Sequence, residues 1–140
     1  MEKLIGISNF LIIVLILVLP ILLLRILNKQ RVRRILIYYF LIGILLLGLI
    51  ICFSAWWNYK ADLMLLKHYG YNFEGMNETE FYEKVLPENM QKVKNIKTSV
   101  MGIGWPLKAI FGIIMITPYM GVIYILNRST ERIRKKKNEA

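Results

Sequence analysis

Three ionisable side chains, near one predicted membrane boundary, are the residues best suited to chemistry in this chain. Asp62 and His68 lie six residues apart in an expected helix, and Lys108 follows Trp105-Pro106 at the start of the last apolar run. Carboxylate, imidazole and ammonium groups are the common acids, bases and ion-pair partners of proteins. The candidate interaction or interface residues are therefore Asp62, His68, Trp105, Pro106 and Lys108.

Each of these residues also has a purely structural interpretation. Lys108 lies within one turn of the boundary, so its ammonium can snorkel to the headgroups; pairing with Asp62 or a ligand is the functional alternative. The six-residue spacing does not place Asp62 and His68 squarely on one helix face. A metal site needs more ligands, and the sequence holds one histidine and one cysteine, Cys52. We predict no catalytic, cofactor-binding or metal-binding residue and no cofactor.

Three long apolar runs must position these side chains. They cover residues 7–24, 35–57 and 105–126, in a chain of 140 residues that is 56% hydrophobic. The second run would span about 34 Å as a helix, enough to cross a hydrocarbon core of about 30 Å. The first run is followed by Arg25 and not by a cleavage site of small residues. This favours a retained span over a signal peptide.

The distribution of charge predicts an orientation. Residues 25–34 hold five basic residues and no acid, and the tail at 127–140 holds six basic residues against two acids. Two crossings separate these segments, so they share one side, which the positive-inside rule makes cytoplasmic. Residues 1–6 and the segment 58–104 are then outside. The net charge of +10 is thus mainly an orientation signal, and no nucleic-acid partner is expected.

The segment 58–104 is too long for a simple connector and is expected to form a small helical cap. Gly70 is a plausible stop signal for a continuation of the second span. Asn77 and Glu80 resemble a capping box for a helix at 78–86, with Met76 packing on Phe81 as a staple.

A further helix is expected at 87–101, after the break at Pro87. Its apolar residues recur at spacings of three and four, which predicts an amphipathic face that packs on the spans, on the bilayer or on a partner; they are Met90, Val93, Ile96 and Val100.

The predicted fold class is an all-α membrane protein with three transmembrane helices and a small helical extracytoplasmic segment between the second and third. We expect a multi-pass protein of a plasma membrane, bacterial in type, with its N-terminus outside and its C-terminus in the cytoplasm. Its partners are the bilayer, anionic lipid at the basic loop and tail, and an unidentified protein.

The expected function is that of a non-catalytic accessory, regulatory or immunity/exclusion-type subunit that acts through the outer segment. An oligomeric, holin-like pore is one alternative, but it needs a polar stripe along a span that the first two spans lack. An interfacial enzyme is the other alternative, and it needs convergent polar groups at one depth, for which Asp62, His68 and Lys108 are the available set.

Overall fold

The computed structural model describes residues 2–29 and 34–138, and all regular elements within these ranges are helices. Residues 30–33 of the basic loop, with Arg31 and Arg33, lie outside the described residues, as do residues 1, 139 and 140. The order is α1 (Glu2–Lys29), α2 (Ile35–His68), α3 (Glu78–Tyr82), a 3-10 turn η1 (Pro87–Asn89), α4 (Met90–Met101) and α5 (Trp105–Asn138).

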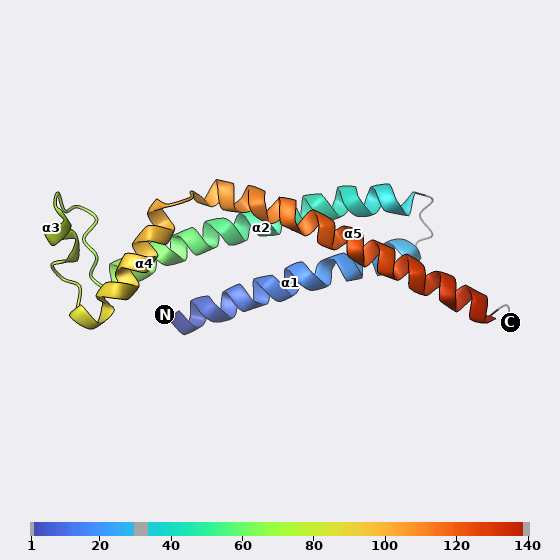
Figure 1. Ribbon diagram of the computed structural model, residues 1–140, viewed down its shortest axis with the longest axis horizontal. Helices are drawn as coiled ribbons and strands as arrows, with labels where there is room; N and C mark the ends of the chain where they lie inside the picture. The colour runs from blue at the N-terminus through green and yellow to red at the C-terminus, as the bar shows by residue number, and fades with distance from the viewer. Residues whose placement is uncertain (1, 30–33, 139–140) are drawn as a thin grey trace.

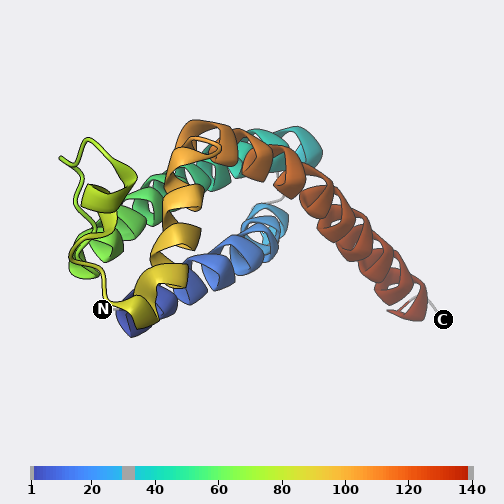
Figure 2. The ribbon, with the colours of Figure 1, turned by 60° about the vertical axis from the view of Figure 1, so that its left-hand side comes forward.

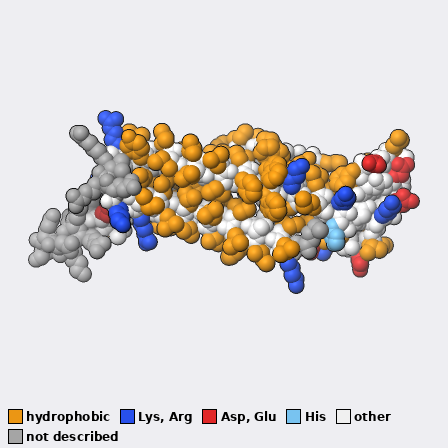
Figure 3. Space-filling view, turned by 180° about the vertical axis from the view of Figure 1, so that it is seen from behind, with side chains coloured by type: hydrophobic (Ala, Val, Ile, Leu, Met, Phe, Trp, Pro, Cys, Tyr) orange, Lys and Arg blue, Asp and Glu red, His pale blue; other side chains and the backbone are white. Residues whose placement is uncertain are grey.

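Three of these helices are long and apolar enough to cross a membrane: α1, α2 and the Trp105–Glu131 part of α5. The predicted all-helical class with three candidate spans is confirmed at this level. Each predicted apolar run lies within a longer helix, and α5 continues unbroken into the basic tail. A belt of hydrophobic side chains covers the middle of one face, and most charged side chains lie beyond it (Figure 3).

The central helix is α2, which packs against α1 and against α5, whereas α1 and α5 contact each other sparsely (Figure 1). We call the end of the bundle that holds the start of α1, the end of α2 and the start of α5 the cap end. The opposite end, with the basic residues of α5, is the tail end. Towards the tail end α5 diverges from the other two helices (Figure 2).

Tyr39 of α2 is fully buried where the three long helices meet. Its hydroxyl donates to the carbonyl oxygen of Met120 at 3.3 Å, and its ring lies against the rings of Phe40 and Tyr124. A buried hydroxyl needs such a partner, because lipid offers none. The surrounding core is apolar; its other buried members are Leu24, Leu27, Leu47, Ile51, Ala109, Ile116 and Met120.

Two glycines allow α2 and α5 to approach closely. A Cβ atom at Gly43 would lie 2.2 Å from the terminal methyl of Met120, so Met120 fills the space that the glycine leaves. A Cβ atom at Gly112 would lie 2.7 Å from Cγ2 of Ile51. Small residues at helix contacts are the usual means of tight packing in membranes. Here each glycine receives a large side chain from the facing helix.

Residues 58–68 of the segment predicted as a cap belong to α2, and the rest, residues 69–104, is called the cap from here on. It begins with a Schellman turn, which confirms Gly70 as the stop signal of α2. The N–H of Tyr71 donates to Leu66 O at 3.0 Å, and the N–H of Gly70 donates to Lys67 O at 3.2 Å. Gly70 has a φ of +84°, a conformation that side chains disfavour. The turn directs the chain back onto the protruding end of α2.

The cap has its own apolar core against α2. Leu66, Tyr71, Val85 and Val93 are its buried members. The amphipathic face predicted for residues 87–101 is confirmed, because its residues pack in this cluster rather than on lipid; they are Met90, Val93, Ile96 and Val100. The first turn of that predicted helix is η1, a 3-10 turn opened by Pro87.

The predicted capping box and staple are wrong in detail. The helix expected at 78–86 is only α3, the Asn77 side chain makes no cap bond, and Met76 is 90% exposed. Glu80 instead accepts a hydrogen bond from the N–H of Met76 at 2.7 Å. The helix stops early because a turn after Tyr82 carries Val85 into the cap core, where its burial outweighs another helical turn.

We expect Gly112→Ala to destabilise the bundle by about 1–3 kcal/mol, because the new methyl group overlaps a branched side chain on a packed helix. Gly121→Ala is the matched control in the same helix, since nothing lies within 4 Å of its Cβ position. Thermal unfolding in detergent, followed by tryptophan fluorescence, measures the difference. Equal melting temperatures for the two variants would contradict the proposed close approach.

Candidate interaction site at the cap end

Asp62, Ser99 and Lys108 form a polar cluster that joins three helices. The Ser99 hydroxyl donates to Oδ2 of Asp62 at 3.2 Å. Nζ of Lys108 donates to the Ser99 carbonyl oxygen at 3.0 Å and reaches its Oγ at 3.4 Å. The pairing of Lys108 with Asp62, which was the alternative to snorkelling, is therefore indirect, with Ser99 between the two charged groups.

The helix geometry explains this meeting. Asp62 lies on the last turns of α2, Ser99 on the last turn of α4 and Lys108 on the first turn of α5. The link between α4 and α5 is only three residues long, so the start of α5 lies beside the end of α4. The N–H of Lys108 donates to Gly104 O at 3.2 Å, which starts α5 directly after that link.

The cluster is suited to holding helices together rather than to catalysis. A nucleophilic serine needs a base that takes its proton. The carboxylate of Asp62 accepts the hydroxyl proton of Ser99, but the ammonium group of Lys108 donates to both oxygen atoms of the same serine and so engages the oxygen that would attack. Ser99 and Lys108 are also exposed, so no excluded-water pocket surrounds them. Two charges bridged by a hydroxyl therefore act as a tie between α2, α4 and α5.

His68 is not part of this cluster. It lines a small hollow with Glu2, Lys3 and Tyr69 at the start of α1. The Tyr69 hydroxyl donates a short hydrogen bond to Glu2, which raises the pKa of Tyr69, and Lys92 lies 3.6 Å from the same carboxylate. The three residues that the enzyme alternative requires at one depth therefore lie in two clusters, because His68 lies beside the start of α1.

Trp105 and Pro106 set the beginning of α5. Pro106 occupies the first turn, where its missing N–H costs no helical hydrogen bond. Trp105 is half-buried beside it. These two residues hold Lys108 at the level of Ser99 and contribute no ionisable group of their own.

A second polar cluster joins α1 and α2 within the apolar region. Nδ2 of Asn9 donates to Oδ1 of Asn58 at 2.7 Å, and Nε1 of Trp57 donates to Oγ of Ser8 at 3.1 Å. Asn58 in turn donates to Ser54 O at 3.0 Å. Ser8 and Asn9, two of the few polar residues of the first span, are thus bonded to the second span.

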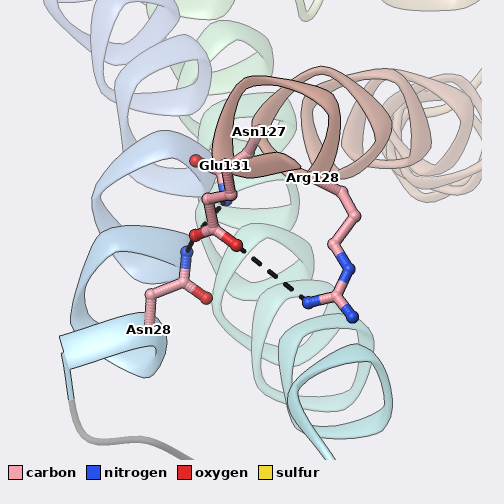
Figure 4. Close-up of polar contacts among 4 residues, drawn as sticks. All are labelled: Asn28, Asn127, Arg128 and Glu131. Carbon is pink, nitrogen blue, oxygen red and sulfur yellow. Dashed lines mark hydrogen bonds and ion pairs between the residues drawn. The ribbon is translucent and has the colours of Figure 1, made fainter. Parts of the chain in front are cut away.

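The tail end has a corresponding tie (Figure 4). Oε1 of Glu131 accepts hydrogen bonds from Asn28 of α1 at 2.6 Å and from Asn127 at 3.2 Å. Its other oxygen lies 4.0 Å from the guanidinium of Arg128. An acid within the basic tail therefore attaches α5 to the end of α1, a role that the charge count alone does not reveal.

Sequence reasoning missed Ser99 as the bridging residue. Ser99 and Asp62 are 37 residues apart. No local pattern predicts that the one serine of α4 faces α2. Among the described residues, no three His, Cys, Asp or Glu side chains come together as metal ligands. Cys52 is half-buried and packs against the bundle core.

No family model, curated protein or solved structure matches the chain. The proposal of a function therefore rests on the side chains at the cap end.

The cluster of Asp62, Ser99 and Lys108 predicts an energetic coupling between its two charged residues, which a double-mutant cycle measures. Asp62→Asn and Lys108→Gln should show a coupling of about 0.5 kcal/mol in unfolding free energy, since exposed ion pairs are weak. Ser99→Ala should abolish that coupling, because it removes the bridging hydroxyl. Thr98→Ala is the control, as its hydroxyl bonds within α4 to Lys94 O. A coupling that survives Ser99→Ala would show that the two charges interact directly.

Proposed function

We propose that this chain is a non-catalytic accessory or regulatory subunit, of the immunity or exclusion type, that binds another membrane protein through its cap end. The observation that supports the proposal is an apolar hollow of about 360 Å³ on the outer turns of α2. Leu63, Met64 and Phe73 line it, and Lys60 and Lys67 flank it. Met64 and Phe73 are about half exposed.

The chemistry of this hollow suggests its partner. It lies past the aromatic residues Trp56, Trp57 and Tyr59, which favour the membrane interface. Exposed apolar patches in such a position mark interaction sites. Two lysines beside the patch favour a partner with acidic residues around an apolar anchor, because such charges complement each other. A protein in the same bilayer would present its outer segment at the matching height.

We further propose that the cap end faces outward from a plasma membrane of bacterial type and the tail end faces the cytoplasm. The basic residues near the tail end support this orientation through the positive-inside rule. Anionic lipid of the cytoplasmic leaflet would contact the same basic residues.

The alternatives have less support. A holin-like pore needs polar side chains that face a lumen, whereas Ser8, Asn9 and Asn58 are used in contacts between α1 and α2. An interfacial enzyme needs a nucleophile and base in a site that excludes water, whereas Ser99, which donates to the Asp62 carboxylate, lies on an exposed surface beside the exposed Lys108. Binding through the cap requires neither feature.

A photo-crosslinking amino acid at Met64 or Phe73 should capture one discrete membrane protein in native membranes, and the same amino acid at Gln91 of α4 should not. The captured protein, once purified, should bind the wild-type chain and bind Met64→Glu at least tenfold more weakly, since a charge enters the apolar hollow. Gln91→Glu is the charge-matched control. Adducts between copies of this chain alone would contradict an accessory role.

Cysteine accessibility tests the orientation. In a Cys52→Ala background, Cys at Glu88 should react with a membrane-impermeant maleimide in intact cells. Cys at Ser129 should react only after the membrane is permeabilised. The reverse pattern would overturn the proposed topology.

A further inference from the structure

A second and larger hollow lies between α3 and α4. Its volume is about 540 Å³. Lys94 and Lys97 of α4 and Glu78 of α3 contribute its charged side chains, and Met101 with Gly102 forms its apolar end. It shares no lining residue with the hollow proposed for the protein partner.

Lys97 is held as a cation by three aromatic rings. Its Nζ lies 5.0 Å from the ring centre of Phe81, 5.2 Å from that of Tyr82 and 5.8 Å from that of Tyr71. Partial burial opposes the charge, but a hydrogen bond with Tyr82 and the proximity of Tyr71 and Glu78 raise the pKa of Lys97. The ammonium is thus charged and fixed in place before any ligand arrives.

The second basic residue lies on the same side of α4. Lys94 and Lys97 are three residues apart, so their side chains neighbour each other on the helix surface. Lys94 is exposed and makes no ion pair among the described residues. Two adjacent ammonium groups form a site for a phosphate, while the carboxylate of Glu78, on the facing element, favours a cation.

The apolar end of this hollow points to the membrane. Met101 is 64% exposed, and Ile103 in the following link is 53% exposed. The candidate span begins at Trp105, directly after these residues. The charged part of the hollow therefore lies within a few residues of the level where phospholipid headgroups meet acyl chains.

We propose that this hollow binds the headgroup of a phospholipid that carries a primary amine next to its phosphate. The phosphate lies between Lys94 and Lys97, the amine faces Glu78, and the acyl chains run past Met101 and Ile103 into the bilayer. A free phosphorylated amine would use the charged groups but leave the exposed apolar residues uncovered. The lipid satisfies both parts of the hollow, which is why we assign the site to a lipid. This inference does not depend on the proposed protein partner.

Native mass spectrometry of the delipidated full chain with lipids of defined headgroup tests the site. Phosphatidylethanolamine should bind more tightly than phosphatidylglycerol with the same acyl chains. Lys94→Gln should weaken phosphatidylethanolamine binding about fivefold, the usual share of one basic residue near a lipid surface. Lys84→Gln is the matched control, because Lys84 is an exposed lysine of the cap outside the hollow.

Glu78→Gln separates headgroup recognition from general attraction to phosphate. It should remove the preference for phosphatidylethanolamine over phosphatidylglycerol and leave the binding of the latter equal or tighter. O-phosphoethanolamine without acyl chains should bind at least tenfold more weakly than the lipid. Any one of three results would overturn the proposal. The first is an equal loss of phosphatidylethanolamine affinity in Lys94→Gln and Lys84→Gln. The others are an affinity for O-phosphoethanolamine equal to that for the lipid, and a headgroup preference that Glu78→Gln leaves unchanged.

Discussion

The length of α2 is the constraint on which the rest of the structure depends. Its 34 residues extend about 51 Å as a helix, well beyond a hydrocarbon core of about 30 Å. Inside lipid every backbone amide must be satisfied within the helix, so the helix cannot end before the interface. The excess lies at the cap end, beyond the apolar run that ends at Trp57. That part gives α4 and the cap a surface to pack on, and it places Asp62 at the level of Ser99.

Within the apolar region, polar side chains bond to each other or to backbone carbonyls. The Tyr119 hydroxyl donates to Leu17 O at 2.8 Å, and the Tyr39 hydroxyl donates to Met120 O at 3.3 Å. Both of these bonds join two different helices. At both ends of the bundle charged groups continue this pattern, through Ser99 at the cap end and through Glu131 at the tail end.

The candidate site was only partly predictable from sequence. The end of α2 at Gly70 followed from local chemistry, because a left-handed turn favours glycine. The inward face of α4 followed from spacing, because Val93 and its neighbours repeat with the helical period. The separation of His68 from Asp62 also followed from spacing, because six residues do not bring two side chains to one face of a helix. The staple of Met76 failed because the cap core recruits Val85 and shortens α3.

The sequence by itself determined that three helices are apolar and long enough to cross a membrane, because this property depends on uninterrupted composition along one segment. It also determined the clustering of basic residues, from which the proposed orientation follows. Only the tertiary structure decided that Ser99 bridges Asp62 and Lys108, that Lys97 lies among three rings, and that Glu131 binds Asn28. These contacts join residues distant in the chain, and their geometry depends on how helices cross and rotate, which no local pattern encodes.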